Sequence, residues 1–235
     1  ELEHLEDVLS ELSLSTTSTQ IITTSQVRLL CFIPEKELRI FRLKQKDSYD
    51  LFRVNFKTPF ESDEFLALIK FCDGHPLAIK LATSIVRFYE SPQTALNAIK
   101  EKSFSIPTRS ELNKNSSLEV CLAIAYDVLN YDSKKLLWIL SELPSGVFEK
   151  YLNSEYLKLD SVEESFAYLK LWNLVEPIHE LDSFNRIGVL TPIRHFVRNK
   201  SCSNENFYEL EKAFLTLAEF HSGWVAALEY TYSAP

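Results

Sequence analysis

The stretch Cys72–Leu81, "CDGHPLAIKL", ends one helix and begins another. The segment before it, "SDEFLALIKFC", has a cap at Ser62 and four apolar residues at helical spacing: Phe65, Leu68, Ile69 and Cys72. Gly74 suits the left-handed conformation that ends a helix. Pro76 suits the first turn of the next helix, where its missing N–H costs no hydrogen bond. The stretch therefore predicts two packed helices joined by a tight turn.

Similar signals lie on both sides of this turn. The segment "DSYDLFRVNF" predicts a short helix that packs through Tyr49, Leu51 and Phe52. In "SPQTALNAI", Ser91 is the expected cap and Pro92 the first helical residue. We therefore expect a small helical domain at residues 46–102. The polar segment that follows predicts a linker at 103–115, and its part from Phe104 to Asn115 is the candidate hinge.

A third region, residues 116–200, predicts helices, a hairpin and a closing helix, which is the order of a winged helix. Ser116 with Glu119, and Ser161 with Glu164, form capping boxes, and Asp132 or Ser133 is expected to cap a helix between them. The extended segments "LVEPIHEL" and "RIGVL" flank the polar turn "DSFN" and predict the hairpin. Residues 201–235 are amphipathic and predict the start of a helical, TPR-like arm.

The amino-terminal residues 1–45 carry a different pattern. "ELEHLEDVLSEL" has one apolar helical face, "QIITTS" predicts a buried strand, and "ELRIFRL", which alternates Leu38 and Ile40 with arginines, predicts another strand. This order resembles the edge of an α/β domain. The expected fold class is mainly α, with the end of a P-loop-type α/β domain, a small helical domain, a winged-helix domain and the start of a helical repeat.

The composition of the chain disfavours several classes of function. The net charge of -8 argues against nonspecific nucleic-acid binding, which depends on Lys and Arg at phosphates. No apolar run is long enough for a membrane helix, so no membrane contact is expected. The 4 cysteines form no CxxC pair, which favours buried thiols and a cytoplasmic protein. Met is 0, including at position one, so we expect a fragment of a longer protein.

The residues predict no catalytic group and no metal ligand. The 5 histidines form no HExxH motif. Cys72 and His75 have CxxH spacing, but zinc needs four ligands and the sequence has no second pair. We interpret them as a buried thiol and a loop histidine. DNA binding is also disfavoured, because Glu163 and Glu164 open the helix before the hairpin, where a winged helix meets phosphates.

The ordered set of segments resembles the STAND signal-transduction ATPases, in particular their NB-ARC (apoptotic-ATPase-like) module. "IITTSQ" is similar to the family's strand ending in TSR or TTR, and "GHPLAIKL" resembles its GLPLAL motif. "SLEVCLAIAYDVL" and "LTPIRHFVRN" resemble the first and last helices of its winged-helix domain. The resemblance covers nearly the whole chain, from just after the Walker B strand.

The resemblance implies a site for ADP or ATP with Mg²⁺. In the family the proline of the GxP motif lies against the bound adenine, so Gly74, His75 and Pro76 would form one wall of the site. Thr24, Ser25 and Gln26 would lie at the sensor strand. The chain departs from the family at three points: it has no Walker A motif, Gln26 stands at the sensor arginine, and Leu190 and Thr191 stand at the histidine and aspartate of the plant-type MHD motif. Alone, it should bind the nucleotide weakly or not at all and should not hydrolyse it.

The function we expect from the resemblance is the regulatory part of an ATP/ADP-dependent STAND switch, which couples nucleotide state to domain opening and self-association. The full-length protein would be a slow ATPase switch, with protein partners bound by the helical arm. Two alternatives stay open. One is a winged-helix transcriptional regulator; the other is a protein-interaction module that binds no nucleotide.

Overall fold

The computed structural model describes residues 38–56, 62–105, 117–143, 146–149, 159–178 and 186–201, with isolated positions at 7, 8, 10–12, 152, 157, 215 and 219. The chain divides into two units between Phe41 and Arg42, and all helices and strands described below belong to the second unit. This unit is mainly helical, which confirms the expected fold class at that coarse level.

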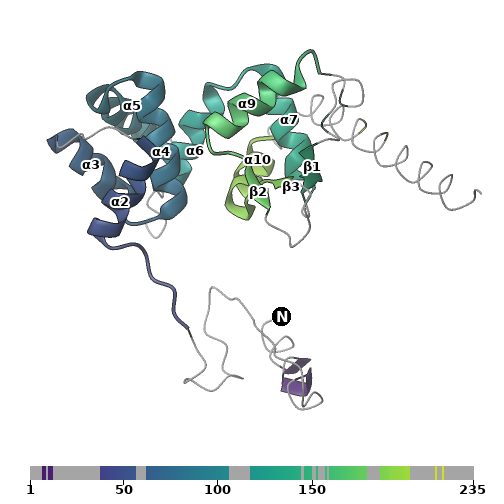
Figure 1. Ribbon diagram of the computed structural model, residues 1–235, viewed down its shortest axis with the longest axis horizontal. Coiled ribbons are helices and arrows are strands. Elements are labelled where there is room, and N and C mark those ends of the chain that lie inside the picture. Colours follow the sequence, from purple (N-terminus) through teal and green to yellow (C-terminus); the bar gives the residue numbers. More distant parts are fainter. Residues whose placement is uncertain are drawn as a thin grey trace, which may run out of the picture. The chain divides into compact units, whose positions relative to one another are not determined.

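Residues 45–105, here called the helical part, form four helices: α2 (Gln45–Phe56), α3 (Asp63–Cys72), α4 (Pro76–Tyr89) and α5 (Pro92–Ser105). Helix α4 is central, because α2, α3 and α5 all pack on it (Figure 1). Its side chains are buried almost without a break from Leu77 to Val86. The predicted caps are confirmed: Ser62 Oγ accepts from Phe65 N–H at 3.3 Å, and Ser91 Oγ accepts from Thr94 N–H at 3.3 Å.

The segment just before α2 was predicted wrongly. Residues 38–44 form no strand, and Leu38 and Ile40 are 87% and 90% exposed. Alternation of apolar and charged residues produces a strand only where a neighbouring strand completes its hydrogen bonds. The described residues supply no such neighbour to this segment.

Residues 117–201, here called the carboxy-terminal part, contain these elements: α6 (Ser117–Asp127), α7 (Tyr131–Ser141), β1 (Val147–Phe148), α9 (Val162–Leu171), β2 (Glu176–Ile178), β3 (Arg186–Gly188) and α10 (Thr191–Ser201). The three strands form one antiparallel sheet in the order β1-β3-β2. The predicted hairpin is confirmed, because β2 pairs with β3 through Pro177 and Ile187.

One predicted cap in this part is wrong. The cap of α7 is Asn130, whose side-chain oxygen accepts from Ser133 N–H at 2.8 Å, rather than Asp132 or Ser133. Asp132 lies in the first turn, where its negative charge is favourable near the helix amino terminus. The predicted cap at Ser161 is confirmed, since its Oγ accepts from Glu164 N–H at 3.3 Å. Ser116 lies outside the described residues.

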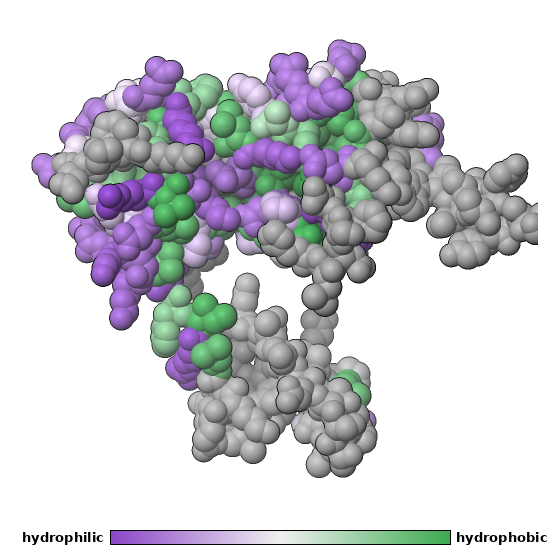
Figure 2. Space-filling view, viewed as in Figure 1, coloured by the Kyte–Doolittle hydropathy of each residue, from purple (hydrophilic) through white to green (hydrophobic). Residues whose placement is uncertain are grey.

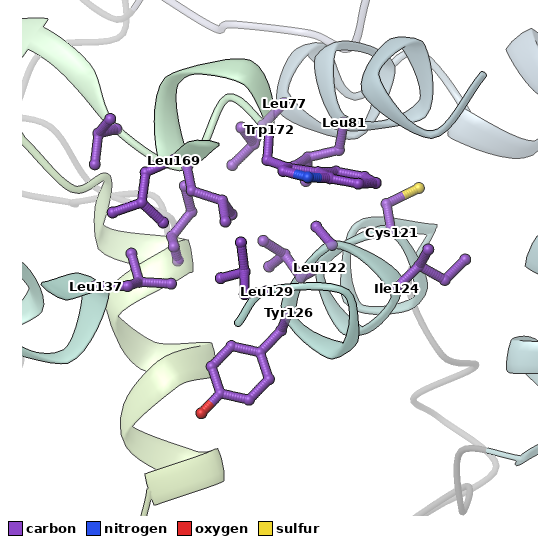
Figure 3. Packing of buried hydrophobic residues seen from close by; sticks show 14 of the residues in the cluster. Leu77, Leu81, Cys121, Leu122, Ile124, Tyr126, Leu129, Leu137, Leu169 and Trp172 are labelled. Carbon is purple, nitrogen blue, oxygen red and sulfur yellow. The ribbon is translucent and has the colours of Figure 1, made fainter. Parts of the chain in front are cut away.

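A single hydrophobic core connects the two parts. Leu77 and Leu81 of α4 lie near Leu122 of α6 and near Trp172, which follows α9 (Figure 3). All of these side chains are buried. Helix α5 continues to Ser105, past the beginning of the predicted linker at 103–115, and residues 106–116 lie outside the described residues. The face that the two parts share through α4, α6 and α9 is called the joint below.

Candidate functional site

The turn between α3 and α4 is the centre of the candidate site. Asp73 and Gly74 both have left-handed backbone angles, with φ of 47° and 67°. Asp73 N–H donates to Lys70 O at 3.2 Å, and His75 N–H donates to Cys72 O at 2.9 Å. Two consecutive left-handed residues therefore reverse the chain and satisfy carbonyls at the end of α3.

Gly74 lies against the backbone that enters α2. Leu43 N–H donates to Gly74 O at 2.9 Å. A Cβ atom on Gly74 would lie 2.3 Å from Leu43 O, far inside van der Waals contact. Glycine is therefore required here twice, for its backbone angle and for this close approach. The turn is fixed to the segment through which the chain passes from the first unit to the second.

His75 is the cap of α4. Its Nδ1 atom accepts from Ala78 N–H at 3.4 Å, so the ring is neutral at that nitrogen. Burial lowers the pKa of His75, and the nearby positive charge of Arg42 lowers it further. The histidine is thus held as a neutral hydrogen-bond acceptor at the start of the helix.

Pro76 begins α4 and its side chain is exposed, while Gly74 behind it is buried. The proline ring therefore offers an apolar surface to the outside of the turn. The first residues of α4 also bring the positive end of the helix dipole to this place. An exposed apolar ring and the positive end of a helix dipole therefore lie together at this turn.

Arg42 supplies a second positive group beside the turn. It forms an ion pair with the Asp73 carboxylate, and its Nη1 also donates to Asp73 O at 3.1 Å. No sequence pattern indicated this role, because the segment was interpreted as a strand. Both Arg42 and Asp73 side chains are more than half exposed, so a ligand could compete for the guanidinium.

The structure brings three of the predicted site residues together: Gly74, His75 and Pro76 form one turn. The other three, Thr24, Ser25 and Gln26, lie outside the described residues. Cys72 does not join His75 in a site, because its side chain is fully buried in the core while His75 caps α4. Within the described ranges, no group of three or more His, Cys, Asp and Glu could hold a metal ion.

An open hollow of about 550 Å³ lies near the turn, at the beginning of α2. Its lining is mostly apolar, with lysine and glutamine at one side: Lys44, Gln45, Lys46, Tyr49, Leu66 and Ile69. Leu43, which bonds to Gly74, directly precedes this lining. None of the turn residues 73–76 lines the hollow. Hydrophilic side chains dominate much of the described surface around the helical part (Figure 2).

The basic residues of the carboxy-terminal part are mostly engaged within the protein. Arg198 donates to both oxygens of Glu142, at 2.9 and 2.8 Å. Lys170 donates to Glu149 at 2.8 Å and lies over the Phe166 ring. Because these charges are paired, α9 and α10 offer few cations to a phosphate backbone.

Comparison with models of known protein families and with curated proteins gave no match. The described residues include no helix with the length and apolar character needed to cross a membrane.

Proposed function

We propose that this chain is the regulatory part of a STAND-type nucleotide switch. In this proposal residues 1–45 are the end of the nucleotide-binding domain, 46–102 the small helical domain, 116–200 the winged helix and 201–235 the start of the arm. An adenine nucleotide lies against Pro76. Exchange of ADP for ATP opens the joint and permits self-association.

The observation that carries the proposal is the turn at Gly74–Pro76. Glycine is required there by its backbone angle and its contact with Leu43, and the proline that follows is exposed. Proline also suits the first turn of a helix for structural reasons alone, as at Pro92, so the proposal depends on the ring of Pro76 being exposed beside this turn. The apolar ring and the positive dipole end together suit a purine base with attached phosphates.

Two other features support the proposal. The sheet order β1-β3-β2, with α9 before the hairpin and α10 after it, agrees with the order of elements that the proposed winged helix requires. In addition, Leu38, Ile40 and Phe41 are at least 80% exposed just before α2. Exposed apolar side chains close together in one short segment are typical of a contact surface, here with the rest of a nucleotide-binding domain.

A nucleotide can drive opening only through a difference in affinity between the closed and open arrangements. Pro76 is well placed for this. It begins α4, and α4 also forms the joint with α6. A ligand that shifts the amino terminus of α4 therefore acts on the same rigid helix that holds the carboxy-terminal part.

The test is ADP binding to the protein extended to include its P-loop, measured with a fluorescent ADP analogue. Pro76→Ala should weaken binding roughly tenfold, the effect of about 1.4 kcal/mol of lost contact with the base. Pro92→Ala is the matched control, since Pro92 holds the same first position in α5. It should leave the affinity unchanged.

Three results would refute this function. The first is an equal ADP affinity for Pro76→Ala and the unchanged protein. The second is tight, salt-dependent DNA binding by the chain, which would favour the transcriptional regulator instead. The third is the absence of any adenine-nucleotide binding by the extended protein, which would favour the protein-interaction module.

A further inference from the structure

Two cysteines lie on opposite sides of the joint. Cys72 is the last residue of α3 in the helical part, and Cys121 is in α6 of the carboxy-terminal part. Both are free thiols with 0% exposure. Helix α3 packs against α6, and the neighbouring Cys72 thiol, together with burial, raises the pKa of the Cys121 thiol. Two thiols distant in sequence thus meet where the two parts of the protein touch.

A hydrogen bond between α6 and the end of α3 holds the helices of the two cysteines against each other. Ser117 Oγ donates to Cys72 O at 3.3 Å, and Ser117 lies four residues before Cys121 on the same face of α6. The beginning of α6 is therefore fixed against the end of α3. Figure 3 shows Cys121 on the side of α6 toward α4, with Leu77 and Leu81 beyond it.

Beside the buried apolar contacts of the core, polar contacts also cross the joint. Asn173 Nδ2 donates to Ser84 Oγ at 2.8 Å and to Lys80 O at 3.3 Å, and Ser84 Oγ donates to Leu171 O at 2.9 Å. Lys80 also forms an ion pair with Glu176.

One polar atom in the joint weakens it, although the ring that carries this atom is buried in the core. Trp172 Nε1 is buried there with no hydrogen-bond acceptor among the described residues. An unpaired buried N–H destabilises the closed joint by about 1–3 kcal/mol, which opening to water would relieve.

We propose that Cys72 and Cys121 form a redox-sensitive staple: a two-electron oxidant of the peroxide class joins them in a disulfide that locks the helical part to the carboxy-terminal part. The proposal rests on the proposed function for its consequence, since a locked joint would hold the switch closed. The formation of the disulfide itself does not depend on that function.

The chemistry balances with hydrogen peroxide as the oxidant. One thiol attacks the peroxide, becomes a sulfenic acid and releases one water. The second thiol then attacks the sulfenic sulfur, the S–S bond forms, and a second water leaves. Two thiols lose two electrons and two protons, and one peroxide is reduced to two waters.

Burial controls when this reaction occurs. With the joint closed, neither sulfur is exposed to solvent, and a buried thiol is unreactive. Transient opening admits the oxidant, and reclosing brings the second sulfur into contact. Oxidation therefore captures molecules that open and close, and it fixes them in the closed arrangement.

The test is peptide mapping of the chain after treatment with hydrogen peroxide, under non-reducing conditions. Trypsin places the four cysteines in four different peptides, with Cys72 in residues 71–80 and Cys121 in residues 115–134. We expect these two peptides to be joined in the monomeric band. A Cys31→Ser/Cys202→Ser variant should give the same joined pair and lose both remaining thiols together.

Thermal unfolding provides a second measurement. The oxidised variant with only Cys72 and Cys121 should unfold at a higher temperature than its reduced form, because the disulfide closes a loop of roughly fifty residues in the unfolded chain. A reductant should reverse the increase. Cys121→Ser should show neither the joined peptides nor the increase.

Two outcomes would overturn the staple: both thiols remaining free after peroxide treatment, or Cys72 and Cys121 each joined to a different cysteine. Neither outcome bears on the nucleotide switch. Conversely, absence of ADP binding in the extended protein would refute the switch and leave the joined peptides as they are.

Discussion

Two turns in this protein contain residues in the left-handed backbone conformation, but the turns have different structural roles. After α3, Asp73 and Gly74 are left-handed; after α9, Asn173 is left-handed with φ of 53°. At the first turn the missing side chain of Gly74 permits close contact with Leu43, and Pro76 faces outward. At the second turn the Asn173 side chain reaches across the joint to hydrogen-bond with Ser84.

The comparison shows that α4 is held at two places, its amino terminus and its middle, by two different turns. The glycine turn fixes its amino terminus to the segment entering α2, and the asparagine turn fixes its middle to the carboxy-terminal part. At one position a side chain is excluded by sterics, and at the other a particular side chain is needed. Substitutions at the two turns should therefore cause different losses of stability, and different second substitutions should reduce those losses.

The largest effect is expected for Gly74→Ala. The left-handed angle costs alanine about 1–2 kcal/mol, and the contact with Leu43 O at 2.3 Å adds about 1–3 kcal/mol because both partners are backbone. We expect urea unfolding to show a loss of about 3 kcal/mol.

Gly188→Ala is the matched control. Its added Cβ would meet Ile178 Cδ1 at 2.5 Å, but this atom is the end of a flexible side chain, and no positive φ is required at Gly188. We expect a loss of less than about 1 kcal/mol. Equal losses for the two variants would show that the close contact with Leu43 is not the determining feature of the glycine turn.

The turns also show what the sequence could predict. Local signals were sufficient for the helix ends at Ser62, Pro76 and Pro92, because capping and proline geometry depend on a few neighbouring residues. Asn130 was missed as a cap, since Asp132 and Ser133 are equally good candidates by type.

Contacts across long sequence separations could not be predicted. The bond from Asn173 to Ser84, the meeting of Cys72 with Cys121 and the approach of Leu43 to Gly74 depend on the packing of helices distant in the chain. The same limit explains why the strand predicted for "ELRIFRL" was wrong, because a strand forms only with a partner strand. For the candidate site, the sequence predicted the turn residues but not Arg42 beside them.

The second effect in size is expected for Asn173→Ala. The substitution removes the amide that donates to Ser84 and Lys80, and it places alanine at a positive φ. We expect a loss of about 2 kcal/mol in urea unfolding, about half from each cause. Asn173→Gly tolerates the angle and should lose only about 1 kcal/mol.

A double-mutant cycle of Asn173→Gly with Ser84→Ala sharpens this comparison. The two side chains share one hydrogen bond, so the combined loss should be smaller than the sum by about 0.5–1.5 kcal/mol. If the losses simply add, the asparagine turn does not hold the joint through Ser84, and the distinction drawn between the two turns fails.

The smallest effect concerns pH and separates the turns again, because only the glycine turn contains a titrating cap. Burial and Arg42 lower the pKa of His75 in the folded protein below its ordinary value of about 6.5. Above that value the imidazole is neutral in both states, and its contribution to stability is complete. As the pH falls, the unfolded chain takes up the proton first, so stability is lost until the pH passes the lowered folded pKa.

His75→Asn tests this directly, since asparagine is a good cap that does not titrate. Between pH 8 and pH 5 the melting temperature of the unchanged protein should fall more than that of His75→Asn, because only the unchanged protein loses the contribution of a neutral His75. Acids and the other histidines contribute equally to both proteins. NMR titration of the His75 ring should give a pKa that rises when Arg42 is replaced by glutamine. Parallel melting curves would mean that His75 is protonated as easily in the fold as in the unfolded chain, in which case Nδ1 could not be the acceptor that begins α4.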